Sequence, residues 1–374
     1  MFVYGRRDAR SSRADRQKCG TLGGSGAMMR MGSECWFDCL PKLELHLHLE
    51  GAIPLEALWE LIRKYGGEPG IPNLAALKNR FEYRDLDHFL EVWSWRNRFL
   101  REYEDFAFGA EAVARDLLHQ HIRYAEAFYS PADFADHGLD TQRITEAIRL
   151  GLERVPGVRV VLVADLVRDR GPEVGARTLD EVIGVRDLGV VGIGLGGSEV
   201  EFPPEPFRDV YDAARRAGLR TSAHAGEAAG PESIWGALRH LRVDRIGHGT
   251  RAEEDEQLLD HLAECQIPLE VCPLSNVRTG VVPSLDLHPV RRYFERGLVV
   301  TINTDDPRMF GNSLAEEFRL LNATLGFSRE EIRALLLLAV EASWMSEPEK
   351  EAVREEFTSD PVWLDAGAAD RTGA

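Results

Sequence analysis

The sequence has few cysteines and no long apolar run. Its five cysteines, an odd number among 374 residues, include no C-x-x-C pair. A disulfide framework is therefore not expected, and a reducing compartment is the plain interpretation. No apolar segment approaches the length of a membrane-spanning helix, and the N-terminus lacks the apolar core of a signal peptide. We therefore expect a cytoplasmic protein with no membrane partner.

Positive charge is also in short supply. The chain has 45 Lys and Arg against 62 Asp and Glu, which gives a formal net charge of -17. No basic patch stands out in the part of the sequence that is expected to fold. Nucleic acids and anionic membranes are therefore poor partners, and a small uncharged or cationic molecule is a better match. The sequence does not indicate an oligomeric state.

Composition divides the chain into three parts. Residues 1–35 are rich in Arg, Ser, Gly and Met without periodicity, which predicts a disordered tail, with a basic docking arm as the alternative. Residues 36–346 form the predicted folded domain, and the 44% hydrophobic content of the chain is enough for a sizeable core. Residues 347–374 are acidic and sparse in apolar residues, which predicts a frayed C-terminal tail.

Eight strand-like segments alternate with helical patterns in the predicted domain. Most of them are dense in Val, Ile and Leu, as strands covered on both faces should be. They span residues 42–48, 122–129, 158–165, 190–195, 219–224, 245–248, 267–272 and 298–304. Eight such strands predict an α/β fold of the (β/α)8 barrel type, with a doubly wound sheet as the alternative.

The interval between the first two predicted strands is much longer than a simple βαβ unit requires. It contains several tryptophans and phenylalanines, among them Phe89 and Trp93. We expect extra helices there that pack their aromatic side chains into the core. Some of these side chains could instead form an apolar lid over the mouth of the barrel.

Histidine occurs twice in the first predicted strand, as His46 and His48. Residues i and i+2 of a strand project from the same face, so both imidazoles point the same way, as two ligands of one metal ion must. A His-x-His pair alone is weak support, because histidine is often simply half-buried. Further polar residues end other predicted strands: His224, His248, Asp305 and Asp306.

In a (β/α)8 barrel these strand ends meet at one rim, where such folds carry their active sites. Imidazoles from His46, His48 and His224, with one carboxylate, suit Zn²⁺ and leave a position for water. The metal would lower the pKa of that water and give a hydroxide nucleophile. Glu227 is placed to donate and accept protons, and His248 to deprotonate the water and stabilise its charge. One of the two aspartates can bind the metal while the other contacts the substrate.

Several short runs together resemble the adenosine deaminase family, a group of metal-dependent barrels within the amidohydrolase superfamily. They occur in the family's order and cover roughly residues 40–345. They read PKLELHLHLEG at 41–51, YAE at 124–126, LGGSE at 195–199, AHAGE at 223–227, IGHG at 246–249, EVCPLSN at 270–276 and NTDDP at 303–307. Each run could occur by chance, but the ordered set is specific.

The resemblance implies a metal site and a reaction. One zinc ion would be held by His46, His48, His224 and Asp305. His248 would orient and deprotonate the attacking water, which adds to C6 of the purine before ammonia leaves. The fourth strand ends in glycines, without a Lys that could bridge a second metal ion, which agrees with a single-metal site. A cytidine-deaminase type of zinc site is excluded because its P-C-x-x-C pair is absent.

The resemblance also implies contacts to the purine. Glu227 would protonate N1, Asp306 would bond N7, and the backbone N–H of Gly197 would bond N3. Glu227, His248 and Asp306 are thus the expected catalytic residues. The expected substrate contacts are His48, Glu50, Gly197 and Asp306.

The resemblance implies that the substrate is an adenine nucleoside. Several adenine-bearing substrates are compatible with it. Glu50 stands where adenosine-specific enzymes usually carry Asp, and LGGSE stands where they usually read LAGDE. Deaminases of free adenine usually carry Ser at the position of Gly197 and Asp at that of Gly247. The pattern is compatible with adenosine, 2′-deoxyadenosine or 6-amino-6-deoxyfutalosine. A deaminase of free adenine, another amidohydrolase with two metals and a non-catalytic barrel are the alternatives.

Overall fold

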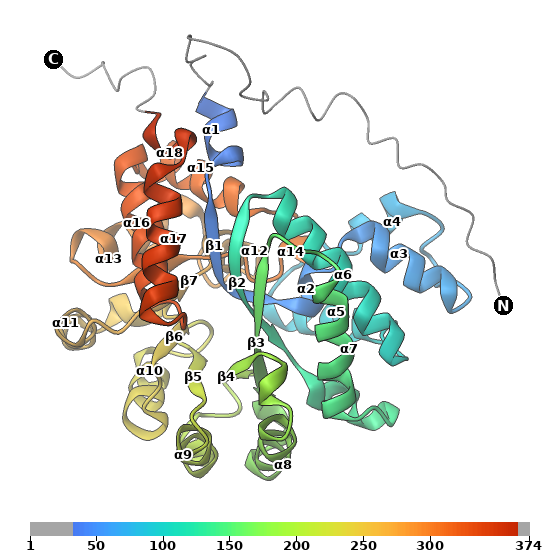
Figure 1. Ribbon diagram of the computed structural model, residues 1–374. Coiled ribbons are helices and arrows are strands. Elements are labelled where there is room, and N and C mark those ends of the chain that lie inside the picture. Colours follow the sequence, from blue (N-terminus) through green and yellow to red (C-terminus); the bar gives the residue numbers. More distant parts are fainter. Residues whose placement is uncertain (1–32, 366–374) are drawn as a thin grey trace, which may run out of the picture.

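The computed structural model describes residues 33–365, and Figure 1 shows their arrangement. The predicted tail at residues 1–35 lies outside the described residues, apart from the start of helix α1 (Ser33–Cys39). Cys39 is disulfide-bonded, which the sequence analysis did not predict, whereas Cys265 and Cys272 are free. Among the described residues, no helix combines the length and the apolar character needed to cross a bilayer.

Eight parallel strands follow one another in chain order around a barrel. Backbone hydrogen bonds between Asp305 and the first strand, to the carbonyl of His46 and from the amide of His48, close it. The strands are β1 (Lys42–His48), β2 (Ile122–Tyr129), β3 (Arg159–Val167), β4 (Val190–Gly196), β5 (Arg220–Ala225), β6 (Arg245–His248), β7 (Leu269–Val271) and β8 (Val300–Ile302). The predicted (β/α)8 barrel is confirmed, and the doubly wound alternative is wrong.

Helices cover the outside of the barrel, as Figure 1 shows. The predicted extra helices between the first two strands are confirmed: α2 (Leu49–Ala52), α3 (Leu55–Lys64), α4 (Leu74–Asn79), α5 (Leu86–Asn97) and α6 (Tyr103–His119). The later helices on the outer ring include α7 (Thr141–Glu153), α8 (Pro172–Ile183), α9 (Arg208–Arg216), α10 (Pro231–Gly236), α11 (Glu256–Cys265), α13 (Val290–Glu295), α15 (Leu314–Leu325) and α16 (Arg329–Ala342).

The acidic C-terminal segment differs from its prediction as a frayed tail. It forms α17 (Glu347–Ser359) and α18 (Pro361–Leu364), which lie beside α16 in Figure 1. Ser346 and Glu349 form a capping box that satisfies the first turn of α17. Phe357 and Trp363 are buried against each other and against the core. Two well-placed aromatic side chains therefore anchor a segment whose composition is otherwise polar.

A chain of buried charged groups crosses the interior of the barrel. Arg245 donates to Glu126 and to Glu270, each at 2.5 Å, and Glu270 in turn contacts Nδ1 of His46 at 2.7 Å. All four side chains are at most 1% exposed. Buried charges are tolerated only when they are paired and hydrogen-bonded, so this network fixes the orientation of His46.

Candidate active site

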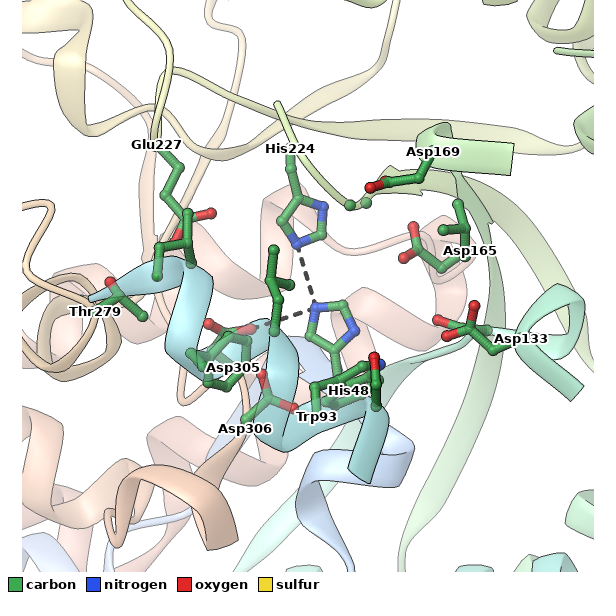
Figure 2. A pocket seen from close by; sticks show the side chains of 18 of the residues that line it. His48, Trp93, Asp133, Asp165, Asp169, His224, Glu227, Thr279, Asp305 and Asp306 are labelled. Atoms are coloured by element: carbon green, nitrogen blue, oxygen red, sulfur yellow. Dashed lines mark hydrogen bonds and ion pairs between the residues drawn. The ribbon is translucent and has the colours of Figure 1, made fainter. Parts of the chain in front are cut away.

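A cavity of about 360 Å³ opens at the C-terminal ends of the strands. The predicted site residues that line it are His48, Gly197, His224, Glu227, His248, Asp305 and Asp306. His46 is fully buried beside them, with its ring 4.6 Å from that of His224. Glu50 is not among the lining residues. Figure 2 shows side chains from distant parts of the chain turned toward one open space.

Four potential ligand atoms converge at one end of this cavity. Nε2 of His224 lies 3.1 Å from Nε2 of His46 and 3.2 Å from Nε2 of His48. Oδ1 of Asp305 lies 3.3 Å from Nε2 of His48 and 3.7 Å from Nε2 of His46. Ligands of a tetrahedral zinc ion with bonds of 2.0–2.1 Å are about 3.3 Å apart. These residues therefore fit a divalent cation, and they form a His/Asp metal-binding group.

Burial shifts two of the three imidazoles toward the neutral form that a metal ligand needs. The contact between Nδ1 of His46 and Glu270 leaves the lone pair of Nε2 free to face the other ligands. Although burial alone would raise it, Arg245 and His46 lower the pKa of Glu270 to about 2, so this partner is a carboxylate. Burial lowers the pKa of His48 to about 3 and that of His224 well below its usual value. Neutral imidazoles bind cations, whereas imidazolium ions do not.

The backbone at the site is held in an uncommon conformation. His248 has φ of 59° and Asp305 has φ of 63°, both in the left-handed region that residues other than glycine rarely adopt. Ser275 donates a hydrogen bond of 2.6 Å to Oδ2 of Asp305, which leaves Oδ1 to face the imidazoles. Such strain persists where the surroundings fix it, and it concentrates at functional sites.

A relay of hydrogen bonds determines which nitrogen of His248 carries a proton. The backbone N–H of Val290 donates to Nδ1 of His288, so neutral His288 donates from Nε2 to Oδ1 of Asn276. The amide nitrogen of Asn276 then donates to Nδ1 of His248 at 3.0 Å. The neutral imidazole of His248 therefore carries its proton on Nε2, which faces Glu227 at 3.6 Å.

This tautomer bears on the two roles predicted for His248. A protonated Nε2 donates a hydrogen bond to a negatively charged oxygen, but it offers no lone pair to accept a proton from water. The arrangement favours charge stabilisation over deprotonation. Sequence reasoning left His288 as an ordinary histidine and gave Asn276 no role, although Asn276 belongs to the EVCPLSN run.

Two carboxyl groups in the cavity are shifted toward their protonated forms. Burial raises the pKa of Glu227 to about 7. Burial, together with the neighbouring Asp305, raises the pKa of Asp306 well above its usual value. Oδ1 of Asp306 has no hydrogen-bond partner among the described residues. Both groups can therefore bring a proton to a ligand that offers acceptors.

Glu50 is turned into the protein. It is 2% exposed, and its Oε1 accepts a hydrogen bond of 3.0 Å from the backbone N–H of Ser130. Helix α2 begins directly after β1, so the strand alternation that carries His46 and His48 into the cavity ends before Glu50. The prediction that Glu50 contacts the substrate stays a prediction.

Gly51 leaves the room that Asp306 occupies. A Cβ atom on residue 51 would lie 2.7 Å from Cβ of Asp306 and closer still to its carboxylate. We expect Gly51→Ala to displace Asp306 and to lower kcat/KM by about 100-fold, as a displacement of about 1 Å can do. Zinc content should be unchanged, because Asp305 keeps its own contacts. Steady-state kinetics with metal analysis tests this, and full activity of Gly51→Ala would contradict it.

The cavity continues beyond the four residues that could hold a metal ion. Helix α5 contributes Leu86, Phe89, Leu90, Trp93 and Ser94 to its wall. Phe89 also belongs to the buried core, as expected for this aromatic segment, and the alternative of an apolar lid stays a prediction. The ends of β2 and β3 and the turns after them contribute Ser130, Asp133, Asp165, Val167, Asp169 and Arg170. Sequence reasoning missed these acidic residues because nothing in their spacing marks them, since each faces the cavity only in the folded barrel.

Comparison with known proteins agrees with this geometry. Residues 41–359 match the model of a family described as adenosine deaminase. An adenine deaminase of Bordetella avium is 41% identical over 80% of this chain and 96% of its own length. An aminodeoxyfutalosine deaminase of Streptomyces avermitilis is 37% identical over 87% of this chain and 92% of its own. A crystal structure of an amidohydrolase from Burkholderia ambifaria with bound zinc has a TM-score of 0.81 at 28% identity, over 89% of this chain and 94% of that one.

Proposed function

The chain belongs to the adenosine deaminase family and is a hydrolytic deaminase; we propose that it uses one zinc ion to deaminate an adenine nucleoside at C6. The products would be the 6-oxo purine nucleoside and ammonia. Adenosine, 2′-deoxyadenosine and 6-amino-6-deoxyfutalosine are the proposed substrates. His46, His48, His224 and Asp305 are the proposed zinc ligands, which their mutual distances support.

The donors in the cavity support an adenine base. Adenine presents ring nitrogens N1, N3 and N7, all of which accept hydrogen bonds. The proposed partners are the protonated carboxyl of Glu227 for N1, the backbone N–H of Gly197 for N3 and the protonated carboxyl of Asp306 for N7. The raised pKa values of both carboxyls support this assignment.

The proposed chemistry divides between the metal and the protein. Bound zinc would lower the pKa of a water molecule to near neutrality and so supply the nucleophile. Glu227 holds a proton for N1, which makes C6 more electrophilic as the nucleophile adds. His248 donates from Nε2 toward the oxygen that carries developing negative charge. Apolar side chains of α5, among them Phe89 and Trp93, line the cavity and would displace water from around a bound base.

The single observation that favours a nucleoside over a free base is the extent of the cavity. It reaches from Glu227 past Gly197 to the ends of β2 and β3, which leaves room for a group attached at N9. The second candidate is a deaminase of free adenine, which the 41% identity to an enzyme of that name favours.

A substrate panel separates these candidates. Ammonia release should be measured with adenine, adenosine, 2′-deoxyadenosine and 6-amino-6-deoxyfutalosine, with metal analysis of the same sample. We expect kcat/KM for the preferred nucleoside to exceed that for adenine by at least about tenfold, because binding energy from the N9 group contributes to the reaction. A preference for adenine would establish the second candidate. Two metal ions per chain would contradict the single-zinc site.

A further inference from the structure

Three carboxylates lie together on the wall of the cavity formed by β2, β3 and the turns after them. Asp133 belongs to the turn η2 (Pro131–His137), Asp165 to β3, and Asp169 to the turn η3 (Arg168–Arg170). Figure 2 shows them grouped on the side of the cavity away from Glu227 and Asp305. No step of the proposed chemistry at C6 uses them.

Asp165 is the member of this group that points to a ligand. It is 3% exposed and lines the cavity, yet its Oδ1 has no hydrogen-bond partner among the described residues. Figure 2 shows its carboxylate turned toward the imidazoles of the metal site. A buried polar atom without a partner is costly, and Asp165 lines the cavity, so we expect a group bound there to satisfy this atom.

Glycines in β4 make the room for this carboxyl group. A Cβ atom on residue 194 would lie 2.7 Å from Oδ1 of Asp165, and one on residue 196 would overlap Oδ2. Burial raises the pKa of Asp165 well above its usual value, against an opposing effect of Arg168. The protonated carboxyl can both donate and accept a hydrogen bond, as a hydroxyl group on a ligand can.

The positively charged side chains in this part of the cavity already have hydrogen-bond partners in the protein. Among the described residues that line it, Arg170 is the only Lys or Arg, and it pairs with Asp133 at 3.4 Å and with Asp136 at 3.1 Å. The adjacent guanidinium of Arg168 donates to four backbone carbonyl oxygens. An anionic group would therefore meet acidic side chains here, with no free cation among the described residues that line the cavity to bind it.

We propose that Asp165, with Asp133 beside it, forms a subsite that binds hydroxyl groups of an uncharged sugar at N9 and discriminates against a 5′-phosphate. The proposal rests on the proposed function, because it places the purine C6 at the metal and the N9 group toward β3. The proposal adds to that function by naming the residues that select the N9 group and the hydrogen bonds by which they select it. Asp165 is a specificity residue here and takes no part in the reaction at C6.

The test compares substrates that share a base and differ at N9. Adenosine, 9-propyladenine and adenosine 5′-monophosphate should be assayed with the wild-type enzyme. We expect adenosine to be better than 9-propyladenine by at least about tenfold in kcat/KM, since the apolar analogue leaves buried polar groups unpaired. The monophosphate should be poorer than adenosine by at least about 100-fold in kcat/KM, because no free cation in the cavity compensates for the water that the phosphate loses on binding.

Variants then assign the preference to Asp165. Asp165→Leu should lower kcat/KM for adenosine by at least about tenfold, mainly through KM, and leave 9-propyladenine within about twofold. Asp165→Asn keeps a donor and an acceptor in nearly the same shape and should restore the preference for adenosine. The double variant Asp133→Asn with Asp165→Asn should narrow the gap between adenosine and its monophosphate. Asp187→Leu makes the same substitution at a fully exposed aspartate and serves as the matched control.

The outcomes keep this inference separate from the proposed function. The inference would be overturned if Asp165→Leu retained zinc and lost kcat/KM equally for adenosine and 9-propyladenine. It would also be overturned if this variant lost kcat/KM for neither substrate. A wild-type kcat/KM for the monophosphate equal to that for adenosine would also overturn it. If Asp165→Leu does not fold, two measurements still test the inference. They are the wild-type ratio of kcat/KM for adenosine to that for 9-propyladenine, and the same ratio in Asp165→Asn. An enzyme that deaminates only free adenine would instead refute the proposed function.

Discussion

Glu227→Gln should retain zinc and lose about 1,000-fold or more in kcat, within the range that general acid–base catalysis contributes. Glutamine keeps the shape of the side chain and can still donate a hydrogen bond to N1, so substrate binding should change little. It cannot transfer a proton to N1, so the step that makes C6 electrophilic is lost. Ammonia release under saturating substrate, with zinc measured on the same sample, gives both quantities.

The control for this variant lies in the same loop region. Glu232 is an exposed glutamate in the first turn of α10, and its carboxylate accepts a hydrogen bond from the backbone N–H of Gly230. Glu232→Gln makes the identical change of charge outside the cavity and should leave kcat within about twofold. Turnover near the wild-type rate in Glu227→Gln would refute its role as the proton donor. Loss of zinc from this variant would show that Glu227 supports the metal site instead.

The parts of the fold that the sequence predicted well are those governed by local periodicity. Strands β1, β2 and β6 have the predicted bounds, because dense apolar runs and the alternation around His46 and His48 are local signals. Strands β7 and β8 are shorter than predicted, at three residues each. Backbone hydrogen bonds nevertheless continue beyond these bounds, because the N–H of Asn303 donates to the carbonyl of Val271 and that of Leu269 donates to the carbonyl of Val299.

The convergence of the metal-binding group followed from topology. Parallel strands bring their C-terminal ends to one rim, so histidines and aspartates placed there had to meet. The contacts that orient them did not follow from the sequence. Glu270, Asn276 and His288 act through hydrogen bonds between side chains of separate elements. Such pairs have no spacing in the chain that could reveal them.

The direction of individual side chains was the other feature that the sequence did not predict. Glu50 lies two residues after His48, and continued alternation would place it in the cavity. The chain turns into α2 at Leu49, and Glu50 bonds the backbone of Ser130 instead. Asp165 is the converse case, because a residue in a dense apolar strand lines the cavity, with room for its carboxyl group left by glycines of β4.

Asp305→Ala should release zinc on dialysis and abolish turnover. Asp305 is the single negative charge among the four proposed ligands, and three neutral imidazoles alone bind a divalent cation less tightly. We expect the zinc dissociation constant to rise by at least about 100-fold, more than the 10- to 100-fold that loss of an outer contact costs. Competition with a chelator of known affinity measures this, and activity should fall in parallel with zinc content.

Two further variants separate loss of the ligand from disturbance of the backbone. Asp305→Asn keeps the side-chain shape and suits the left-handed conformation at φ of 63°, so it removes the charge with little strain. Ser275→Ala keeps the ligand and removes the hydrogen bond that orients it. Zinc affinity should fall in the order wild type, Ser275→Ala, Asp305→Asn, Asp305→Ala. Unchanged zinc content in both Asp305 variants after dialysis would place the metal on other residues.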